Sequence, residues 1–270
     1  LMILSHKHKF IFLKTKKTAS TSLEIALSKI CGENDIITPV SELTWLGNIR
    51  YFEKNTEEDL RKKINAKKPQ NYKGDFYFEA TYLIKQLFHF YFNKLLTLLF
   101  NPKNLKILKK KRRFKFDQHM EIQEVKKFID RNTYNNYLKF AVVRNPFDQS
   151  ISDYFDQQQR PENPKYNNFN EYLKKRVDYF FFKNKRKISI NNKLEINDFI
   201  RYENLEKDLI KILKKLKIPH QKIISDLKKT KAHSGLRNKR FSLSKLSKTQ
   251  KKKIKKASNF FIKNFYKKIN

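Results

Sequence analysis

Short apolar runs alternate with amphipathic segments along this chain. Phe10–Leu13 reads Phe-Ile-Phe-Leu and Phe140–Val143 reads Phe-Ala-Val-Val. Continuous apolar runs of this length are typical of strands covered on both faces. A third strand is expected within Leu194–Tyr202. Because these runs alternate with helical patterns, we predict a three-layer α/β/α fold with a central parallel sheet.

Apolar residues at helical spacing follow each predicted strand. Leu23, Ala26, Leu27 and Ile30 indicate an amphipathic helix after the first strand. Pro146 suits the first turn of the helix after the second strand. Further helices are expected over residues 117–130, 146–157, 169–176 and 205–216, and a lysine-rich amphipathic helix from residue 243.

Residues 53–113 combine charge-rich helical sequence with an aromatic and leucine-rich run. Glu79, Lys85 and His89 interrupt that run, so no membrane-spanning helix is predicted. We expect a mostly helical insertion within a single domain of residues 1–270. The alternative is an apolar helix that lies on a membrane surface beside the basic cluster at 109–113.

The composition changes this picture little. A chain of 270 residues with 39% hydrophobic residues can bury a large core. The formal net charge of +36 suggests a polyanionic partner. However, Lys, Asn, Ile, Phe and Tyr are all abundant while glycine occurs only 4 times, which is typical of an AT-rich genome. The charge therefore supports a polyanionic ligand only weakly. With Cys31 as the one cysteine and scattered histidines, no metal site is expected, and we expect a cytoplasmic protein.

The segment between the first strand and its helix is a candidate anion site. It reads Lys17-Thr18-Ala19-Ser20-Thr21-Ser22. A loop that enters a helix presents unpaired N–H groups and the positive end of the helix dipole. Small side chains admit a phosphate, and the lysine adds a mobile charge. The alternative is an ordinary helix start with Ser20 or Thr21 as N-cap. The segment lacks the Gly-x-x-x-x-Gly-Lys-Ser/Thr pattern of P-loop NTPases.

A second candidate site follows the second strand. Arg144 comes directly after Phe140–Val143, at the strand end where open α/β sheets bind ligands. Ser152 lies about two helical turns further on and can face the same side. An arginine with a hydroxyl suits a phosphate monoester. The alternative is an ion pair between Arg144 and Asp148 or Asp153.

Together these motifs resemble the sulfotransferase family, especially its glycan-modifying and bacterial branch, which includes heparan sulfate 2-O-sulfotransferase-like enzymes. Their first loop carries Pro-Lys-Thr-Ala/Gly-Ser/Thr-Thr-Ser, and Lys16 stands here in place of the proline. The resemblance implies the P-loop-NTPase-like sulfotransferase fold. It also continues through Asp198–Leu205, which is similar to the family's Tyr-Glu-Asn-Leu segment, and through 231–239, similar to the loop that closes over the nucleotide. It covers most of the chain except about 53–113 and 158–193.

The resemblance implies 3′-phosphoadenosine 5′-phosphosulfate (PAPS) as sulfuryl donor, with no metal. It assigns the 5′-phosphosulfate to Lys17, Thr18, Ala19, Ser20, Thr21 and Ser22, and the 3′-phosphate to Arg144 and Ser152. Arg237 is the best cofactor candidate in the closing loop.

A histidine between the two phosphate motifs serves as general base in related enzymes, and His119 occupies the matching place. Its alternative is a capping or surface histidine. Lys17 would stabilise the leaving phosphate oxygen. The acceptor expected from the family is a carbohydrate hydroxyl, with a lipid or small molecule as alternatives and a peripheral membrane contact through the insertion.

Two other functions compete with a sulfotransferase. A P-loop-type kinase would need a lysine at the end of a glycine-rich loop and an acidic magnesium site, and neither is found in the sequence. A non-enzymatic basic protein that binds nucleic acid or an anionic membrane would carry its basic residues on one face, with no pocket joining Lys17 to Arg144. No specific nucleic-acid partner is expected.

Overall fold

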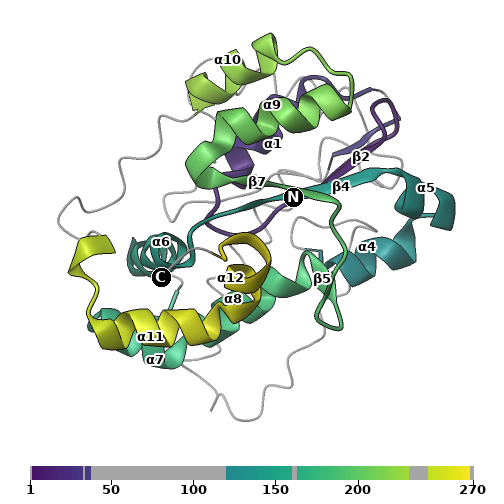
Figure 1. The fold of residues 1–270 in the computed structure, drawn as a ribbon. Coiled ribbons are helices and arrows are strands. Elements are labelled where there is room, and N and C mark those ends of the chain that lie inside the picture. The colour runs from purple at the N-terminus through teal and green to yellow at the C-terminus, as the bar shows by residue number, and fades with distance from the viewer. Residues whose placement is uncertain (1, 33, 38–119, 160–162, 231–242, 268–270) are drawn as a thin grey trace, which may run out of the picture. The chain divides into compact units, whose positions relative to one another are not determined.

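A computed structural model describes residues 2–32, 34–37, 120–159, 163–230 and 243–267 (Figure 1). All of them belong to one compact unit made of residues 1–69 and 116–270. The insertion predicted over 53–113 lies outside the described residues, and the single-domain organisation stays a prediction.

The centre of this unit is a five-stranded mixed sheet with the order β3-β1-β2-β4-β7. Neighbours β2, β4 and β7 are parallel, while β1 runs antiparallel to both β2 and β3. The parallel part is the predicted central sheet, and β1 and β3 extend it at one edge. The strands are β1 (Met2–Ser5), β2 (Phe10–Leu13), β3 (Ile36–Ile37), β4 (Leu138–Val143) and β7 (Asp198–Arg201).

Helices cover both faces of the sheet, which confirms the three-layer α/β/α prediction (Figure 1). Side chains alternate along each strand, so Phe10 and Phe12 join one core cluster while Ile11 and Leu13 join the other. The first cluster is completed by α1 (Ser20–Ser28), α9 (Leu205–Lys215) and α10 (Gln221–Thr230). The second is completed by α4 (Ile122–Phe128), α5 (Arg131–Asn136), α6 (Pro146–Gln159), α7 (Phe169–Lys175), α8 (Val177–Arg186), α11 (Lys248–Ala257) and α12 (Asn259–Phe265).

Several elements are shorter than their sequence patterns suggest. The helix predicted over 117–130 is α4, and a separate helix α5 follows because Asp130 accepts a hydrogen bond from Thr133 N at 2.8 Å and starts it. The strand predicted within Leu194–Tyr202 is β7 alone, since Leu194 belongs to the hairpin of β5 (Ser189–Ile190) and β6 (Lys193–Leu194). The C-terminal helix is divided into α11 and α12 at Ser258. Short 3₁₀ turns occupy Tyr202–Asn204 and Leu243–Lys245.

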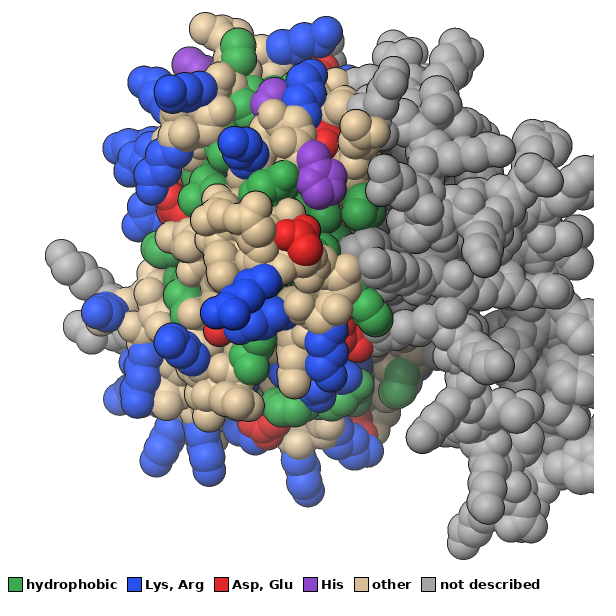
Figure 2. Space-filling model, turned by 90° about the vertical axis from the view of Figure 1, so that its right-hand side faces the viewer, with side chains coloured by type: hydrophobic (Ala, Val, Ile, Leu, Met, Phe, Trp, Pro, Cys, Tyr) green, Lys and Arg blue, Asp and Glu red, His purple; other side chains and the backbone are tan. Residues whose placement is uncertain are grey.

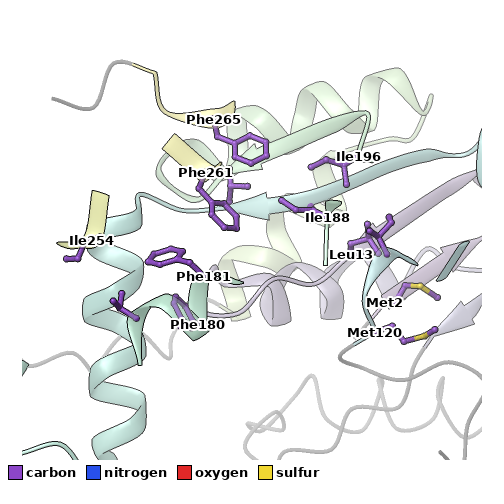
Figure 3. Packing of buried hydrophobic residues seen from close by; sticks show 14 of the residues in the cluster. Met2, Leu13, Met120, Phe180, Phe181, Ile188, Ile196, Ile254, Phe261 and Phe265 are labelled. Carbon is purple, nitrogen blue, oxygen red and sulfur yellow. The ribbon is translucent and has the colours of Figure 1, made fainter. Parts of the chain in front are cut away.

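A cluster of phenylalanines fixes α8 against the C-terminal helices (Figure 3). Phe180 and Phe181 of α8 are buried, and the ring of Phe181 lies 5.7 Å from that of Phe261. Phe265 of α12 in turn lies edge-on to Phe199 of β7, at 4.9 Å between ring centroids. This packing sets the position of α8 beside the sheet, which matters because the same helix reaches the candidate site.

Candidate functional site

The loop between β2 and α1 has an unusual backbone. Lys17 and Ala19 have φ values of 63° and 57°, in the left-handed region that non-glycine residues rarely adopt. Ala19 is the N-cap of α1 and makes no side-chain cap hydrogen bond. The alternative with Ser20 or Thr21 as N-cap is therefore wrong in its choice of residue, because the helix begins at Ser20 itself. Left-handed residues before a helix turn successive N–H groups toward one point, which suits an anion.

Hydroxyl groups inside this loop stabilise its shape. Ser20 Oγ donates to Thr15 O at 2.7 Å and Thr18 Oγ1 donates to the same carbonyl at 3.2 Å. Thr15 Oγ1 donates to the carbonyl of Val142 on β4. The buried hydroxyls of Thr18 and Ser20 thus hold the turn together. The N-terminus of a helix, such as that of α1, is where backbone N–H groups suit an anion. Thr21 and Ser22 lie in that first turn and are partly exposed.

Arg144 joins the second predicted motif to the first. Its Nη1 donates to Lys17 O at 3.0 Å, and its Nε donates to Asp148 Oδ2 at 2.7 Å. The ion pair with Asp148 that the sequence left open is therefore formed. Asp153, the other candidate, pairs instead with Arg176. Arg144 is a buried side chain that links the end of β4, the start of α6 and the loop after β2.

One side of α6 faces Lys17 and Arg144. Asp148, Ser152 and Asp156 recur at every fourth residue, so they lie along the same side of the helix. Asp148 pairs with Arg144, and Asp156 Oδ1 lies 3.0 Å from Lys17 Nζ. Ser152 lies between these two carboxylates and is partly exposed. Its place between them puts Ser152 on the side of α6 that contacts Arg144 and Lys17. Its role as a phosphate ligand stays a prediction.

The third parallel strand adds two residues that the sequence analysis did not place in the site. Tyr202 follows β7, and its ring lies under the Arg144 guanidinium at 4.2 Å from the ring centroid. Glu203 Oε1 accepts a hydrogen bond from Asn145 N at 2.6 Å, at the start of α6. The sequence could have indicated Tyr202 and Glu203, because both directly follow the third predicted strand and the carboxyl ends of parallel strands meet at one edge of the sheet.

Glu203 also reaches the C-terminal helix. Its Oε2 accepts a hydrogen bond from Tyr266 Oη at 2.9 Å. Burial, together with the negative charge and the hydrogen bond of Glu203, raises the pKa of Tyr266 well above its ordinary range. Tyr266 therefore stays a neutral donor. The end of β7, the start of α6 and the end of α12 are connected through Glu203.

Two predicted site residues, His119 and Arg237, lie outside the described residues. The residues next to His119 are described. Met120 is buried, and Glu121 is the N-cap of α4, where it pairs with Arg186 at 2.5 Å. Among the residues that the structure describes, no group of three or more His, Cys, Asp or Glu side chains could hold a metal ion.

The basic side chains follow no single stripe on the face that Figure 2 shows. Lys and Arg are spread over this face with Asp and Glu among them. A basic nucleic-acid or membrane-binding protein was expected to have no pocket joining Lys17 to Arg144. The structure brings these two residues together, since Arg144 donates directly to the Lys17 carbonyl. Within the described part of the chain, no helix is long and apolar enough to cross a membrane.

Comparison with known proteins gives the family of this chain. The model of the family described as "Sulfotransferase family" matches residues 1–268, which is nearly the whole chain. No curated protein and no solved structure matches the chain. The order of the motifs, the parallel strands that carry them and the extent of the match lead to one conclusion: this chain belongs to the sulfotransferase family, and it is a sulfotransferase enzyme.

Proposed function

We propose that this sulfotransferase takes its sulfuryl group from PAPS and transfers it to a hydroxyl of a carbohydrate. The observation that carries the donor assignment is the hydrogen bond from Arg144 Nη1 to Lys17 O. It places the two predicted phosphate motifs side by side at the carboxyl ends of β2 and β4, where ligands of open α/β sheets bind. If both motifs bind phosphate, two separate but adjacent sites would suit a nucleotide with phosphates at both its 3′ and 5′ positions.

The residues at these strand ends fit such a donor. The loop from Lys17 to Ser22 offers main-chain N–H groups at a helix N-terminus that has no acidic residue in its first turn. Arg144 and Ser152 would receive the 3′-phosphate. Arg144 already gives Nε to Asp148 and Nη1 to Lys17 O, so it would hold the phosphate while still anchored to the protein. Arg237, in the predicted closing loop, would add a further cation.

Sulfuryl transfer requires two functions from residues of this chain: stabilisation of the leaving group and acceptance of a proton from the acceptor. The donor supplies an activated sulfuryl group whose leaving group is a phosphate. Lys17 would stabilise the negative charge that builds on the leaving oxygen, aided by the N–H groups of the loop. His119 would accept the proton of the acceptor hydroxyl, since its ordinary pKa is close to neutral pH. Positioning the two reactants in line supplies much of the remaining rate acceleration.

The acceptor is proposed from the family resemblance as a carbohydrate hydroxyl. A lipid or a small molecule is the alternative. We propose that residues 53–113 shape the acceptor side of the enzyme or touch a membrane surface with their aromatic run and basic flank. Replacing these aromatics should alter acceptor use or liposome binding and leave nucleotide affinity unchanged.

Calorimetry with 3′-phosphoadenosine 5′-phosphate (PAP), the desulfated product, tests the donor assignment. PAP should bind far more tightly than adenosine 5′-phosphate, because the missing 3′-phosphate leaves Arg144 and Ser152 without their ligand. The expected loss is about 1–3 kcal/mol or more, because one of the two partners is charged. Equal affinity for the two nucleotides would refute PAPS as donor.

A further inference from the structure

Two buried amide side chains contact the same residue of the loop between β2 and α1. Gln149 Nε2, on α6, donates to Lys16 O at 2.7 Å. Asn184 Oδ1, on α8, accepts from Lys16 N at 2.7 Å. The two helices therefore hold both main-chain groups of Lys16, while the Lys16 residue itself is exposed. Gln149 is 1% exposed and Asn184 is 0% exposed.

Stability alone does not account for these amides. Gln149 Oε1 and Asn184 Nδ2 are buried and have no hydrogen-bond partner among the described residues. Burying an unpaired polar atom is unfavourable, and an apolar side chain of similar size at either position would avoid that cost. What each amide provides, and an apolar side chain would not, is its hydrogen bond to Lys16.

The residue that they hold stands at the start of the strained part of the loop. Lys17 and Ala19 have left-handed backbones, which cost free energy for residues other than glycine. Such a conformation persists only where surrounding contacts impose it. Here α6 and α8 fix the main-chain groups of Lys16, just before the left-handed residues. The hydrogen bond from Arg144 fixes the carbonyl of Lys17, the next residue.

We propose that Gln149 and Asn184 are positioning residues, which clamp the Lys16 peptide groups so that the loop keeps the shape that binds the 5′-phosphate end of the donor. This inference rests on the proposed function. Both side chains are too deeply buried to touch a nucleotide, so they act through the loop. They differ in this from Arg144 and Lys17, which are proposed to meet the phosphates directly.

The test uses near-isosteric apolar variants, Gln149→Met and Asn184→Leu, which remove the contact and leave the core filled. Gln157→Met is the matched control. Gln157 lies on the same helix, is 4% exposed and has a buried Oε1 without a partner among the described residues, as Gln149 does. In the structure its side chain makes no hydrogen bond to the described residues of the loop.

Calorimetry compares PAP with adenosine 3′-phosphate, which lacks the 5′-phosphate. Each clamp variant should bind PAP about fivefold to tenfold more weakly, the equivalent of one lost hydrogen bond. Adenosine 3′-phosphate should bind with unchanged affinity, because the 5′-phosphate alone meets the loop. The double variant should lose less than the product of the two single effects, because both act on one residue. Gln157→Met should bind both nucleotides as the parent does.

Equally weakened binding of both nucleotides, or unchanged PAP affinity, would overturn the proposal that Gln149 and Asn184 position the loop. Amide hydrogen exchange gives a second reading that needs no nucleotide. Exchange in residues 14–19 should become faster in Gln149→Met and Asn184→Leu, and exchange in β4 should stay as in the parent. Should the parent protein fail to bind PAP, the donor assignment falls, and hydrogen exchange still decides whether these residues hold the loop.

Discussion

Lys17 Nζ lies 3.0 Å from Asp156 Oδ1, so the ammonium group proposed to meet the phosphosulfate contacts a carboxylate of α6. A second carboxylate of that helix, Asp148, holds Arg144 in the same way. Both cations assigned to the donor therefore have counter-ions within the protein. A nucleotide must compete with Asp156 for Lys17, or share Lys17 with it.

Replacing Asp156 should therefore strengthen nucleotide binding. In Asp156→Asn, Lys17 loses its counter-ion and the site loses a negative charge, so PAP affinity should rise about fivefold, the scale of a partly exposed ion pair. Calorimetry at low ionic strength measures this change, and added salt should reduce it. The gain should disappear in the double variant with Lys17→Ala.

Asp178→Asn is the control for Asp156→Asn. Asp178 forms an ion pair with Lys253 of α11 and not with a lysine of the loop. This variant should leave PAP affinity unchanged. Weaker PAP binding in Asp156→Asn would mean that Asp156 supports Lys17 instead of competing for it.

Arg144→Lys keeps the charge but should weaken PAP binding roughly tenfold or more. A lysine provides no planar fork to contact Asp148, the Lys17 carbonyl and a phosphate together, and it stacks less well on Tyr202. Calorimetry should show a smaller loss for adenosine 5′-phosphate, which lacks the 3′-phosphate. Arg176→Lys is a matched control, because Arg176 also pairs with an aspartate of α6, Asp153. An equal loss of affinity for both nucleotides would contradict the assignment of the 3′-phosphate to Arg144.

Asp35 stabilises the turn between β1 and β2. Its Oδ1 accepts from His6 N at 2.7 Å and from Lys7 N at 3.0 Å, and its Oδ2 accepts from Ser5 Oγ and Gly32 N, both at 2.7 Å. Burial alone would raise the pKa of Asp35, but these hydrogen bonds outweigh it and lower the pKa below the ordinary value of 3.8.

A lowered pKa fixes the sign of the pH dependence. The stabilisation from Asp35 is fully present above the ordinary pKa and is lost as the pH falls through the folded-state pKa. Asp35→Asn should lower the free energy of unfolding by about 2–3 kcal/mol at pH 7, since an amide satisfies fewer of the four donors. Urea denaturation should show this difference shrinking toward pH 3. A difference that stays constant with pH would mean that the charge of Asp35 does not matter.

The sequence predicted the parts of the site that depend on local pattern. The apolar runs of β2 and β4, with Lys17 and Arg144 at their ends, are readable because strand ends at one sheet edge come together. The left-handed Ala19 was missed, because tertiary contacts impose that conformation on a residue that does not favour it.

Contacts between distant segments were also unreadable. Asp156 pairs with Lys17 although the two residues are far apart in the sequence, and no local pattern connects them. Gln149 and Asn184 are single amides within helices and belong to no motif. Only the packing of α6 and α8 against the loop brings them to Lys16.

The last prediction separates nucleotide binding from chemistry. His119→Ala should lower turnover roughly 10²–10⁴-fold, the usual range for a general base. PAP affinity should stay nearly unchanged, because His119 is assigned to the acceptor proton and not to the nucleotide. Lys17→Ala should behave differently and weaken both turnover and PAP binding, since its charge meets the phosphosulfate in the ground state and the transition state. Steady-state kinetics with an identified acceptor, together with calorimetry, distinguishes the two patterns.

The pH dependence gives the same prediction a second reading. The parent enzyme should show turnover that rises with pH through an apparent pKa in the histidine range, because the base must be neutral to accept a proton. This rise should be absent from His119→Ala. Full turnover in His119→Ala would place the base elsewhere. Asp117 or a residue of 53–113 would then be stronger candidates than Glu121, because Glu121 caps α4 and already pairs with Arg186 and Lys183.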